Sequence, residues 1–313
     1  MQMRRATLAA LACALTAASN IYPFNYSNTH GNSMVLQRGG AGALVWGFGA
    51  AFAPISLSLL CNVSGVNVTL PGLVDSEGIW RVRLPPQPAS APGDICSLAG
   101  AAPASAEFFQ LDDVLFGDVL LCGGQSNMAL GMGEVNNATA LIAAAAARPR
   151  IRILSPQYSA QNVSQAQFVL QFAINWTSAA NANGQAVAGF SAVCYLTAAA
   201  LHDELVGDVP FGLIDTAVGG TMISLWLPPA AIGDCLPLPF VPTPPWTLSC
   251  WYNGMFSPLT TGPTDATLIL WDQGVSGQRA AASAAARAPS LRPHAPLHPP
   301  PRSHAPASRR AGE

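Results

Sequence analysis

The first third of the chain carries the pattern of short β-strands. From about residue 20 to residue 112, apolar stretches are separated by Gly, Pro, Asn and Asp at a spacing near ten residues. This spacing predicts a small antiparallel sandwich or barrel, and the region has no helical period. The expected strands are 34–36, 43–46, 55–60, 66–70 and 79–84.

After residue 113 the pattern changes to alternating strands and helices. The expected strands are 119–122, 151–154, 211–214 and 268–271, and the expected helices are 138–147 and 190–206. Strands separated by helices favour a parallel sheet with helices packed on its faces. The sequence therefore predicts an α/β domain over residues 113–277, preceded by a small all-β domain over residues 19–112.

Both ends of the chain differ from this body. Residues 1–18 have the form of a signal peptide, in which Arg4 and Arg5 precede an apolar run too short to span a bilayer. An uncleaved N-terminal anchor is the alternative. No other segment is apolar for long enough to cross a membrane, so we expect no membrane contact after cleavage. Residues 278–313 are rich in Ala, Pro and Arg and contain no aromatic residue, which predicts a disordered basic tail.

Glycosylation signals and cysteines agree with a secretory protein, either secreted or lysosomal. The N-x-[ST] pattern occurs six times, at Asn25, Asn62, Asn67, Asn137, Asn162 and Asn175. Cys13 leaves with the signal peptide, and six cysteines remain, whose pairing the sequence leaves open. We expect Cys61–Cys96 within the β-rich region and Cys235–Cys250 around a Pro-rich segment. There is no C-x-x-C pair to indicate a zinc site.

The clearest chemical feature is the end of the expected strand 119–122. It leads into Gly123-Gly124 and then Ser126, with helical residues following. A Gly pair permits a tight turn, which presents Ser126 at the carboxyl end of a parallel strand, where α/β sheets place their sites. A helix starting there offers free N–H groups to an oxyanion. The alternative is a serine that only caps a helix.

Two further strand ends carry polar or glycine-rich loops. Gly219 and Gly220 follow the strand 211–214, and their N–H groups are candidates to face the same oxyanion. Gln273 follows the strand 268–271 and has an amide able to donate. The alternatives are an ordinary turn for the Gly pair and a simple polar loop residue for Gln273.

Ordered matches along residues 25–277 make the chain resemble one family. They include Asn32–Arg38, Val45–Gly47, Cys122–Met128, Gly189–Val193, Gly219–Thr221 with Trp226, Tyr252–Met255, and Trp271 with Gln273-Gly274. In these blocks the sequence resembles the sialate O-acetylesterase family of SGNH-type hydrolases, some relatives of which deacetylate plant polysaccharides. The resemblance implies a flavodoxin-like hydrolase domain that removes acetyl groups from sugars, without a metal or cofactor. Ser126 matches the nucleophile; the Ser126 N–H, Gly219 or Gly220, and Gln273 match the oxyanion region.

The resemblance fails at the general base. In this family the base lies near the end of the hydrolase domain as Asp-x-x-His, and no such pair occurs here. His30 lies in the β-rich region, His202 lies on the helix beside Asp203, and His294, His298 and His304 lie in the tail. We therefore expect the hydrolase domain to be truncated before that block. Three interpretations stay open: an active secreted carbohydrate O-acetylesterase, an acetylxylan-type esterase, and an inactive product that is at most a glycan-binding remnant.

Composition and charge narrow the partners. The chain has 313 residues, 50% of them hydrophobic and only 10% charged, with a net charge of −2, so it has no electrostatic footprint for nucleic acid. The charge is uneven, since residues 19–277 hold six Arg against 15 acidic residues and no Lys occurs anywhere. An acidic body does not attract an anionic sugar at long range, which keeps neutral O-acetylated glycans among the expected substrates.

Overall fold

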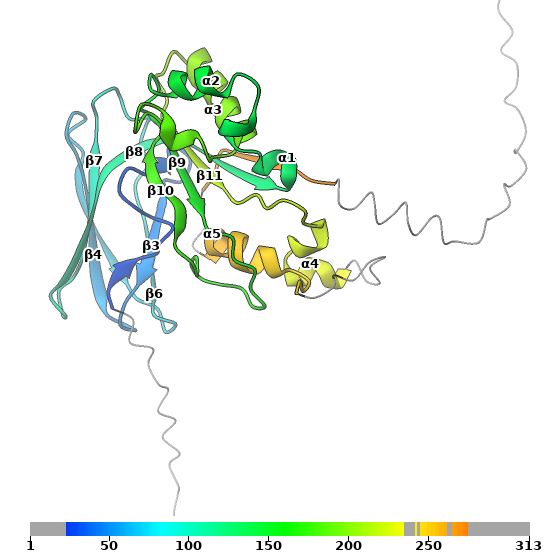
Figure 1. The fold of residues 1–313 in the computed structure, drawn as a ribbon. Coiled ribbons are helices and arrows are strands. Elements are labelled where there is room, and N and C mark those ends of the chain that lie inside the picture. The colour runs from blue at the N-terminus through cyan, green and yellow to red at the C-terminus, as the bar shows by residue number, and fades with distance from the viewer. Residues whose placement is uncertain (1–22, 235–241, 243–244, 262–264, 275–313) are drawn as a thin grey trace, which may run out of the picture.

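The computed structural model describes residues 23–234, 242, 245–261 and 265–274 (Figure 1). The predicted signal peptide, Cys235 and the predicted tail lie outside the described residues. The strands are β1 Asn25–Tyr26, β2 Val35–Gln37, β3 Leu44–Phe48, β4 Pro54–Cys61, β5 Asn67–Leu73, β6 Ile79–Arg83, β7 Cys96–Ala102, β8 Glu107–Gly124, β9 Ile151–Pro156, β10 Phe172–Ser178, β11 Phe211–Asp215 and β12 Leu268–Asp272. The α-helices are α1 Ser126–Ala129, α2 Ala138–Ala145, α3 Ala192–Glu204, α4 Pro229–Asp234 and α5 Ser257–Thr261. Short 3-10 turns lie at Met132–Glu134, Gln185–Val187 and Ile223–Leu225, and a π-helical turn lies at Tyr252–Phe256.

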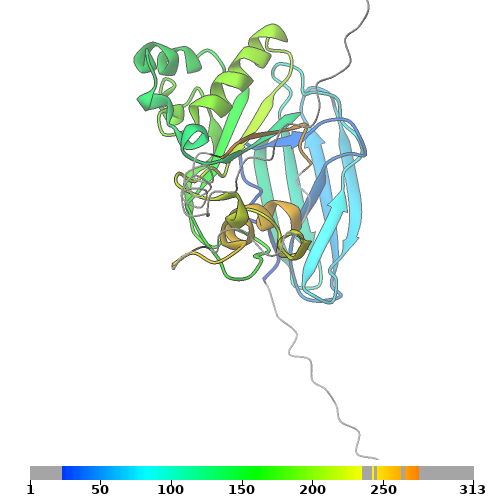
Figure 2. The ribbon, with the colours of Figure 1, turned by 90° about the vertical axis from the view of Figure 1, so that its right-hand side faces the viewer.

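The β-rich region forms two packed layers, which lie side by side in Figure 1 and one behind the other in Figure 2. One layer is the sheet β1-β3-β6, and the other is the antiparallel run β5-β4-β7-β8. Along β4 buried and partly exposed side chains alternate, which is the mark of a strand with one face on the core. The large buried side chains between the layers include Trp80 and Phe24. The Cys61–Cys96 disulfide joins β4 to β7, which confirms that predicted pair.

The second region is a mixed α/β structure built on the same large sheet. Strands β9, β11, β8 and β12 run parallel to one another in the order β9-β11-β8-β12. The expected strands 151–154, 211–214 and 268–271 are confirmed within one or two residues at each end, whereas the expected strand 119–122 is only the last part of β8. The strand β10 was not predicted; it pairs antiparallel with β9 at the edge of the sheet.

A single long strand connects the two regions. β8 spans 18 residues; its first part pairs with β7 and its last part with β11 and β12. The boundary expected after residue 112 falls inside β8, and one hydrophobic cluster includes Val82 of the sandwich together with Ile214 of β11. The two regions therefore share a strand and a core, and their division into two domains stays a prediction.

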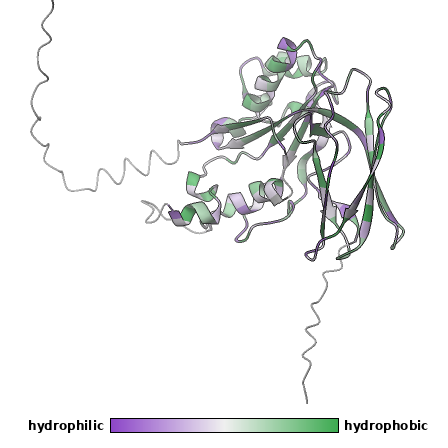
Figure 3. Ribbon diagram, turned by 180° about the vertical axis from the view of Figure 1, so that it is seen from behind, coloured by the Kyte–Doolittle hydropathy of each residue, from purple (hydrophilic) through white to green (hydrophobic). Residues whose placement is uncertain are grey.

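A separate hydrophobic cluster packs on each face of the parallel strands. Leu120 and Cys122 of β8 point into a cluster formed with α2 and α3, whereas Val119 and Leu121 point into the cluster shared with the sandwich and α5. Figure 1 shows α2 and α3 on one side of these strands and α4 and α5 on the other. The central strands are mostly hydrophobic in Figure 3, as expected for parallel strands covered on both faces.

Candidate active site

Ser126 lies at the carboxyl end of β8, where the strand turns into α1. The helix begins at Ser126 itself, and the capping position before it is Gln125, which makes no side-chain capping bond. The Ser126 side chain is exposed. The alternative interpretation, a serine whose hydroxyl caps the helix, is therefore wrong.

The Gly123-Gly124 pair is required by the neighbouring strand β12. A Cβ on Gly124 would lie 2.0 Å from the carbonyl oxygen of Asp272, and the Gly124 φ of +135° disfavours any side chain. A Cβ on Gly123 would lie 2.6 Å from the ring of Trp271. The Gln125 N–H also donates to the Asp272 carbonyl at 2.9 Å. The two glycines thus allow β12 to pack directly against the turn that carries Ser126.

The loop after β11 meets the same turn. The Val218 N–H donates to the Gly124 carbonyl at 3.0 Å, which extends the pairing of β11 with β8 past the end of both strands. A Cβ on Gly219 would lie 3.8 Å from the Ser126 Cα, so the Gly219 backbone is next to Ser126. Gly220 follows with a positive φ of +77°, and both glycines are exposed. The structure therefore brings Ser126 and the Gly219-Gly220 loop together, as the strand ends predicted.

Gln273 follows β12 and reaches the same loop. Its Nε2 donates to the Thr221 carbonyl at 2.7 Å, and its Oε1 accepts from the Gly274 N–H. The Thr221 hydroxyl donates to the Val218 carbonyl and accepts from the Trp226 indole N–H, each at 2.8 Å. The Gln273 side chain thus holds the Gly219–Thr221 loop beside the end of β12 through this hydrogen bond. A primary amide has a second N–H, so this contact does not use all of its donors.

Asp215, the last residue of β11, is a site neighbour that the sequence analysis missed. The residue is 8% exposed, and its carboxylate accepts a hydrogen bond from the Ala217 N–H at 3.0 Å. Burial raises the pKa of Asp215 to about 7. The only signal for it in the sequence is a carboxylate ending a strand of otherwise apolar residues. Its contact with Ala217 places it just ahead of the Gly219 loop.

A second missed feature is a line of aromatic rings that starts at the Ser126 turn. Trp271, whose ring covers Gly123, contacts Trp226 edge to face at 5.5 Å, and Trp226 stacks on Trp251 at 6.0 Å. Trp251 in turn contacts Trp246 at 5.1 Å and Tyr158 at 6.3 Å between ring centroids. These rings come from four separate segments, so no local sequence pattern connects them.

Neither histidine in the described part of the chain lies near Ser126. His202 is in the last turn of α3, with its Nδ1 3.5 Å from Asp203 Oδ1, and a Cβ on Gly207 would touch its ring. The Asp203 carboxylate is engaged by Arg148 at 2.6 Å, which holds the pKa of Asp203 down at about 2. His294, His298 and His304 lie outside the described residues.

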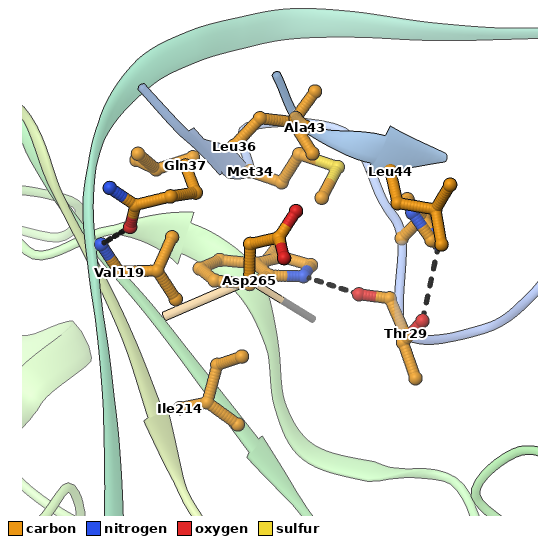
Figure 4. A pocket seen from close by; sticks show the side chains of 12 residues that line it. Thr29, Met34, Leu36, Gln37, Ala43, Leu44, Val119, Ile214 and Asp265 are labelled. Atoms are coloured by element: carbon orange, nitrogen blue, oxygen red, sulfur yellow. Dashed lines mark hydrogen bonds between the residues drawn. The ribbon is translucent and has the colours of Figure 1, made fainter. Parts of the chain in front are cut away.

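His30 lines a cavity at the seam between the sandwich and the parallel strands (Figure 4). Burial lowers the pKa of His30 to about 4. Asp265 lines the same cavity, but its carboxylate pairs with Arg83 at 3.1 Å. Ser126, Gly219, Gly220 and Gln273 are not among the residues lining this cavity. It is therefore separate from the residues at the strand ends.

Two other structural features bear on the chemistry. The described residues hold no cluster of three or more His, Cys, Asp or Glu side chains suited to a metal ion. Among the same residues no helix is both long and apolar enough to span a membrane.

A second disulfide, Cys122–Cys194, joins the end of β8 to α3 four residues before Ser126. Cys250 is buried and forms no disulfide with a described residue, while its expected partner Cys235 is outside them.

The parallel strands with an exposed serine and glycine loops at their carboxyl ends define an esterase-type α/β protein. Comparison with known families agrees: the model for "Carbohydrate esterase, sialic acid-specific acetylesterase" matches residues 116–288, and the chain belongs to this family. The resemblance expected from the sequence is thereby confirmed.

Individual relatives show how much of the family's length is present. Sialate O-acetylesterase from Homo sapiens is 30% identical over 263 residues, which are 81% of this chain and 49% of the relative. The enzyme of that name from Mus musculus is 30% identical over 206 residues, 65% of this chain and 37% of the relative. A crystal structure of a carbohydrate acetylesterase from Xanthomonas citri matches with a TM-score of 0.65 and 27% identity, over 80% of this chain and 52% of that one. The chain spans about half the length of the human relative.

Proposed function

We propose that this protein hydrolyses acetyl esters on O-acetylated sugars, with Ser126 as the nucleophile. The observation that carries the proposal is the meeting of three strand ends at one exposed serine: Ser126 after β8, Gly219 after β11 and Gln273 after β12. Membership of the carbohydrate esterase family supports the reaction class.

The reaction is acyl transfer in two steps. The Ser126 hydroxyl loses its proton to a base as its oxygen attacks the acetyl carbonyl, and the carbonyl oxygen takes up the negative charge. The backbone N–H groups of Ser126, Gly219 and Gly220, with the second N–H of Gln273, stabilise this oxyanion. The sugar oxygen leaves with a proton, and water then attacks acetyl-Ser126 to release acetate and restore the hydroxyl.

The general base decides whether this chain is active. A serine needs a neighbouring histidine to take its proton, and removal of one member of such a triad lowers kcat by a factor of about 10⁴. His202 does not serve, because α3 runs about 16 Å between Ser191 near the strand ends and His202. His30 does not serve either, because it lines the seam cavity, which Ser126 does not line. In the active form we propose, the base comes from outside the described residues. The alternative is an inactive protein that retains sugar binding.

Secretion is part of the proposal. All six N-x-[ST] asparagines, which fall in different strands, loops and one helix cap, are exposed in the structure. Exposure is what a glycosylation enzyme requires of its acceptor, and it supports a secreted or lysosomal glycoprotein. Loss of mass on treatment with peptide N-glycosidase, after expression in a secreting eukaryotic cell, tests this directly.

The esterase test compares the wild type with Ser126→Ala on p-nitrophenyl acetate and on an O-acetylated oligosaccharide. We expect acetate release by the wild type and a fall to the uncatalysed rate in Ser126→Ala. The matched control is Ser58→Ala, a serine on β4 in the sandwich that hydrogen-bonds Thr69. Equal background rates in all three proteins would establish the inactive alternative.

A further inference from the structure

We propose that Asn175 carries an N-linked glycan whose first sugar, an N-acetylglucosamine, lies in a surface hollow beside strand β10. The attachment pattern at this position is Asn175-Trp176-Thr177. The inference rests on the proposed passage through the secretory pathway, and it adds which asparagine holds its glycan against the protein. It does not depend on acetate release.

Asn175 lines two hollows between the loop after β1 and strand β10. The larger, of about 520 Å³, is lined by Asn28, Asn175 and the whole segment 168–172. The smaller, of about 240 Å³, shares Asn28, Phe172 and Asn175 with it and continues to Trp176. The asparagines of the other five N-x-[ST] patterns line neither hollow. Among the six, Asn175 therefore stands where an attached sugar meets a concave surface.

The lining of the larger hollow offers the groups that bind a sugar ring. The ring of Phe172 is an apolar face for the C–H face of a pyranose, and Val169 and Leu170 beside it are 49% and 44% exposed. The side chain of Gln171 is exposed and makes no hydrogen bond with a described residue, so its amide is free to donate to and accept from sugar hydroxyls. The volume falls in the range of small-molecule sites, roughly 300–1,000 Å³.

The walls of the hollow are fixed before any sugar arrives. Asn28 Nδ2 donates to the Phe168 carbonyl at 2.8 Å, and Asn28 Oδ1 accepts from the Phe168 N–H at 3.1 Å. The buried ring of Phe168 contacts Phe172 edge to face, with 5.7 Å between centroids. The Trp176 indole donates to the Thr29 carbonyl at 3.0 Å. A sugar that docks here does not have to order the protein, which keeps the cost of docking small.

The Asn175 side chain is available for attachment. It is exposed, and its amide makes no hydrogen bond with a described residue. Asn62 and Asn162 differ, because their Oδ1 atoms accept from the Ile95 N–H at 2.7 Å and from the Thr247 hydroxyl at 3.0 Å. The donor is a lipid-linked oligosaccharide: the Asn175 Nδ2 forms a bond to C1 of the first sugar and gives up one proton. The bond from C1 to the lipid diphosphate breaks, and the diphosphate leaves.

A glycan at Asn175 also covers an open edge of the sheet. β10 pairs with β9 and with no other described strand, so its outer side is a template for pairing with another chain. The opposite edge of the same sheet is β5, whose first residue, Asn67, begins another N-x-[ST] pattern. Asn67 lines neither hollow. The two edges therefore allow a comparison between a glycan held against the protein and one free in solvent.

The test uses the full chain secreted from a eukaryotic cell and treated with peptide N-glycosidase without denaturation. This enzyme must reach the bond between the asparagine and the first sugar, which a docked sugar shields. We expect the Asn175 glycan to be released at least about tenfold more slowly than the Asn67 glycan. Peptide mass spectrometry measures both rates, because each release converts the asparagine to aspartate. Prior heat denaturation should abolish the difference.

Variants test whether the docked sugar stabilises the fold. We expect Asn175→Gln to lower Tm by about 3 °C and Asn67→Gln to change it by less than about 1 °C. Thr177→Ala, which keeps the asparagine but removes the pattern, should match Asn175→Gln, whereas Thr177→Ser keeps the pattern and the wild-type Tm. Endoglycosidase H, applied to protein with high-mannose glycans, leaves the first sugar in place and should leave Tm unchanged.

Three results overturn the inference: equal release rates at Asn175 and Asn67, no glycan at Asn175 in a protein glycosylated elsewhere, or an unchanged Tm in both Asn175→Gln and Thr177→Ala. A secreted protein without glycan at any of the six asparagines would overturn the glycoprotein proposal together with this inference. The esterase proposal fails separately. Ser126 and Gln273 line neither hollow, and Asn175→Gln is expected to leave acetate release unchanged.

Discussion

Strands β11 and β12 flank β8 on its two sides, and each delivers a loop to Ser126, yet they are held very differently. β11 is buried along all five residues and pairs with both β8 and β9. β12 pairs with β8 and with no other described strand, and Leu268, Ile269 and Trp271 are 39%, 57% and 37% exposed.

The difference shows that the proposed site has a rigid side and a weakly held side. The Gly219 loop continues from β11, which packs against α3 through a dense hydrophobic cluster. Gln273 depends on β12, which is secured mainly by backbone pairing and by the contacts of Trp271 with Gly123 and Trp226. The position of Gln273 is thus the part of the site that most depends on what covers β12.

The largest expected effect comes from a matched pair of isoleucines. Ile214 of β11 and Ile269 of β12 both stand beside Leu121 of β8, but Ile214 is 1% exposed. Ile214→Ala is expected to lower the free energy of unfolding by about 3 kcal/mol, because it leaves a cavity in the core. Ile269→Ala is expected to change it by less than about 0.5 kcal/mol. Urea denaturation measures both; equal losses would show that β12 is buried in solution.

The buried carboxyl group of Asp215 on β11 should make the free energy of unfolding depend on pH. The folded pKa of Asp215, about 7, lies above the value near 3.9 of an unfolded chain, so the folded state binds more protons between these values. Stability is therefore greatest below about pH 4 for this group and falls as pH rises to about 7, by on the order of 4 kcal/mol.

The control for this prediction is Asp215→Asn, which keeps the shape of the side chain and removes the titration. Unfolding free energies of both proteins measured from pH 4 to pH 8 should diverge in slope. Parallel curves would mean that Asp215 is ionised in the folded protein at neutral pH.

A side chain at Gly124 is expected to release the weakly held strand. Because its Cβ would lie 2.0 Å from the Asp272 carbonyl, Gly124→Ala must push β12 away from β8. We expect the amides of β12 to lose protection against hydrogen exchange by about 2 kcal/mol, while those of β11 keep theirs. Gly189→Ala, where a Cβ meets nothing within 4 Å, is the control. Loss of protection in both strands would show that they unfold as one unit.

The smallest expected effect concerns the exposed face of β12. Leu268→Thr should leave the free energy of unfolding within about 0.5 kcal/mol of the wild type, since Leu268 is 39% exposed. It should also reduce self-association, because an apolar edge strand is a template for pairing with other chains. Light scattering over a concentration series measures this, with Leu60→Thr on β4, 53% exposed, as the control. Unchanged scattering would show that this edge is covered in solution.

Local patterns were enough to place most strands but not to join them. The runs around Val119, Ile151 and Phe211 were found because strands covered on both faces are continuously apolar. The length of β8 was missed, because its two parts have different hydrophobic patterns. The first part pairs in the sandwich and has the pattern of a half-exposed strand, whereas the last part has the pattern of a buried strand. β10 was missed because its neighbours along the chain give no signal of an antiparallel edge. The Cys122–Cys194 disulfide, which joins positions 72 apart, depends on how α3 packs on β8.

The sequence by itself determined the local chemistry: Ser126 behind two glycines, a second Gly pair, and Gln273 after a strand. These follow from residue types and their spacing, which can be read without a fold. Only the tertiary structure decided that Trp271 requires those glycines, that Gln273 clamps the Thr221 carbonyl, and that Asp215 is buried beside the loop. It also packed Tyr158 and Trp246 against the buried ring of Trp251. Such contacts join residues tens to more than a hundred positions apart, and their energies depend on packing and burial, which no local pattern encodes.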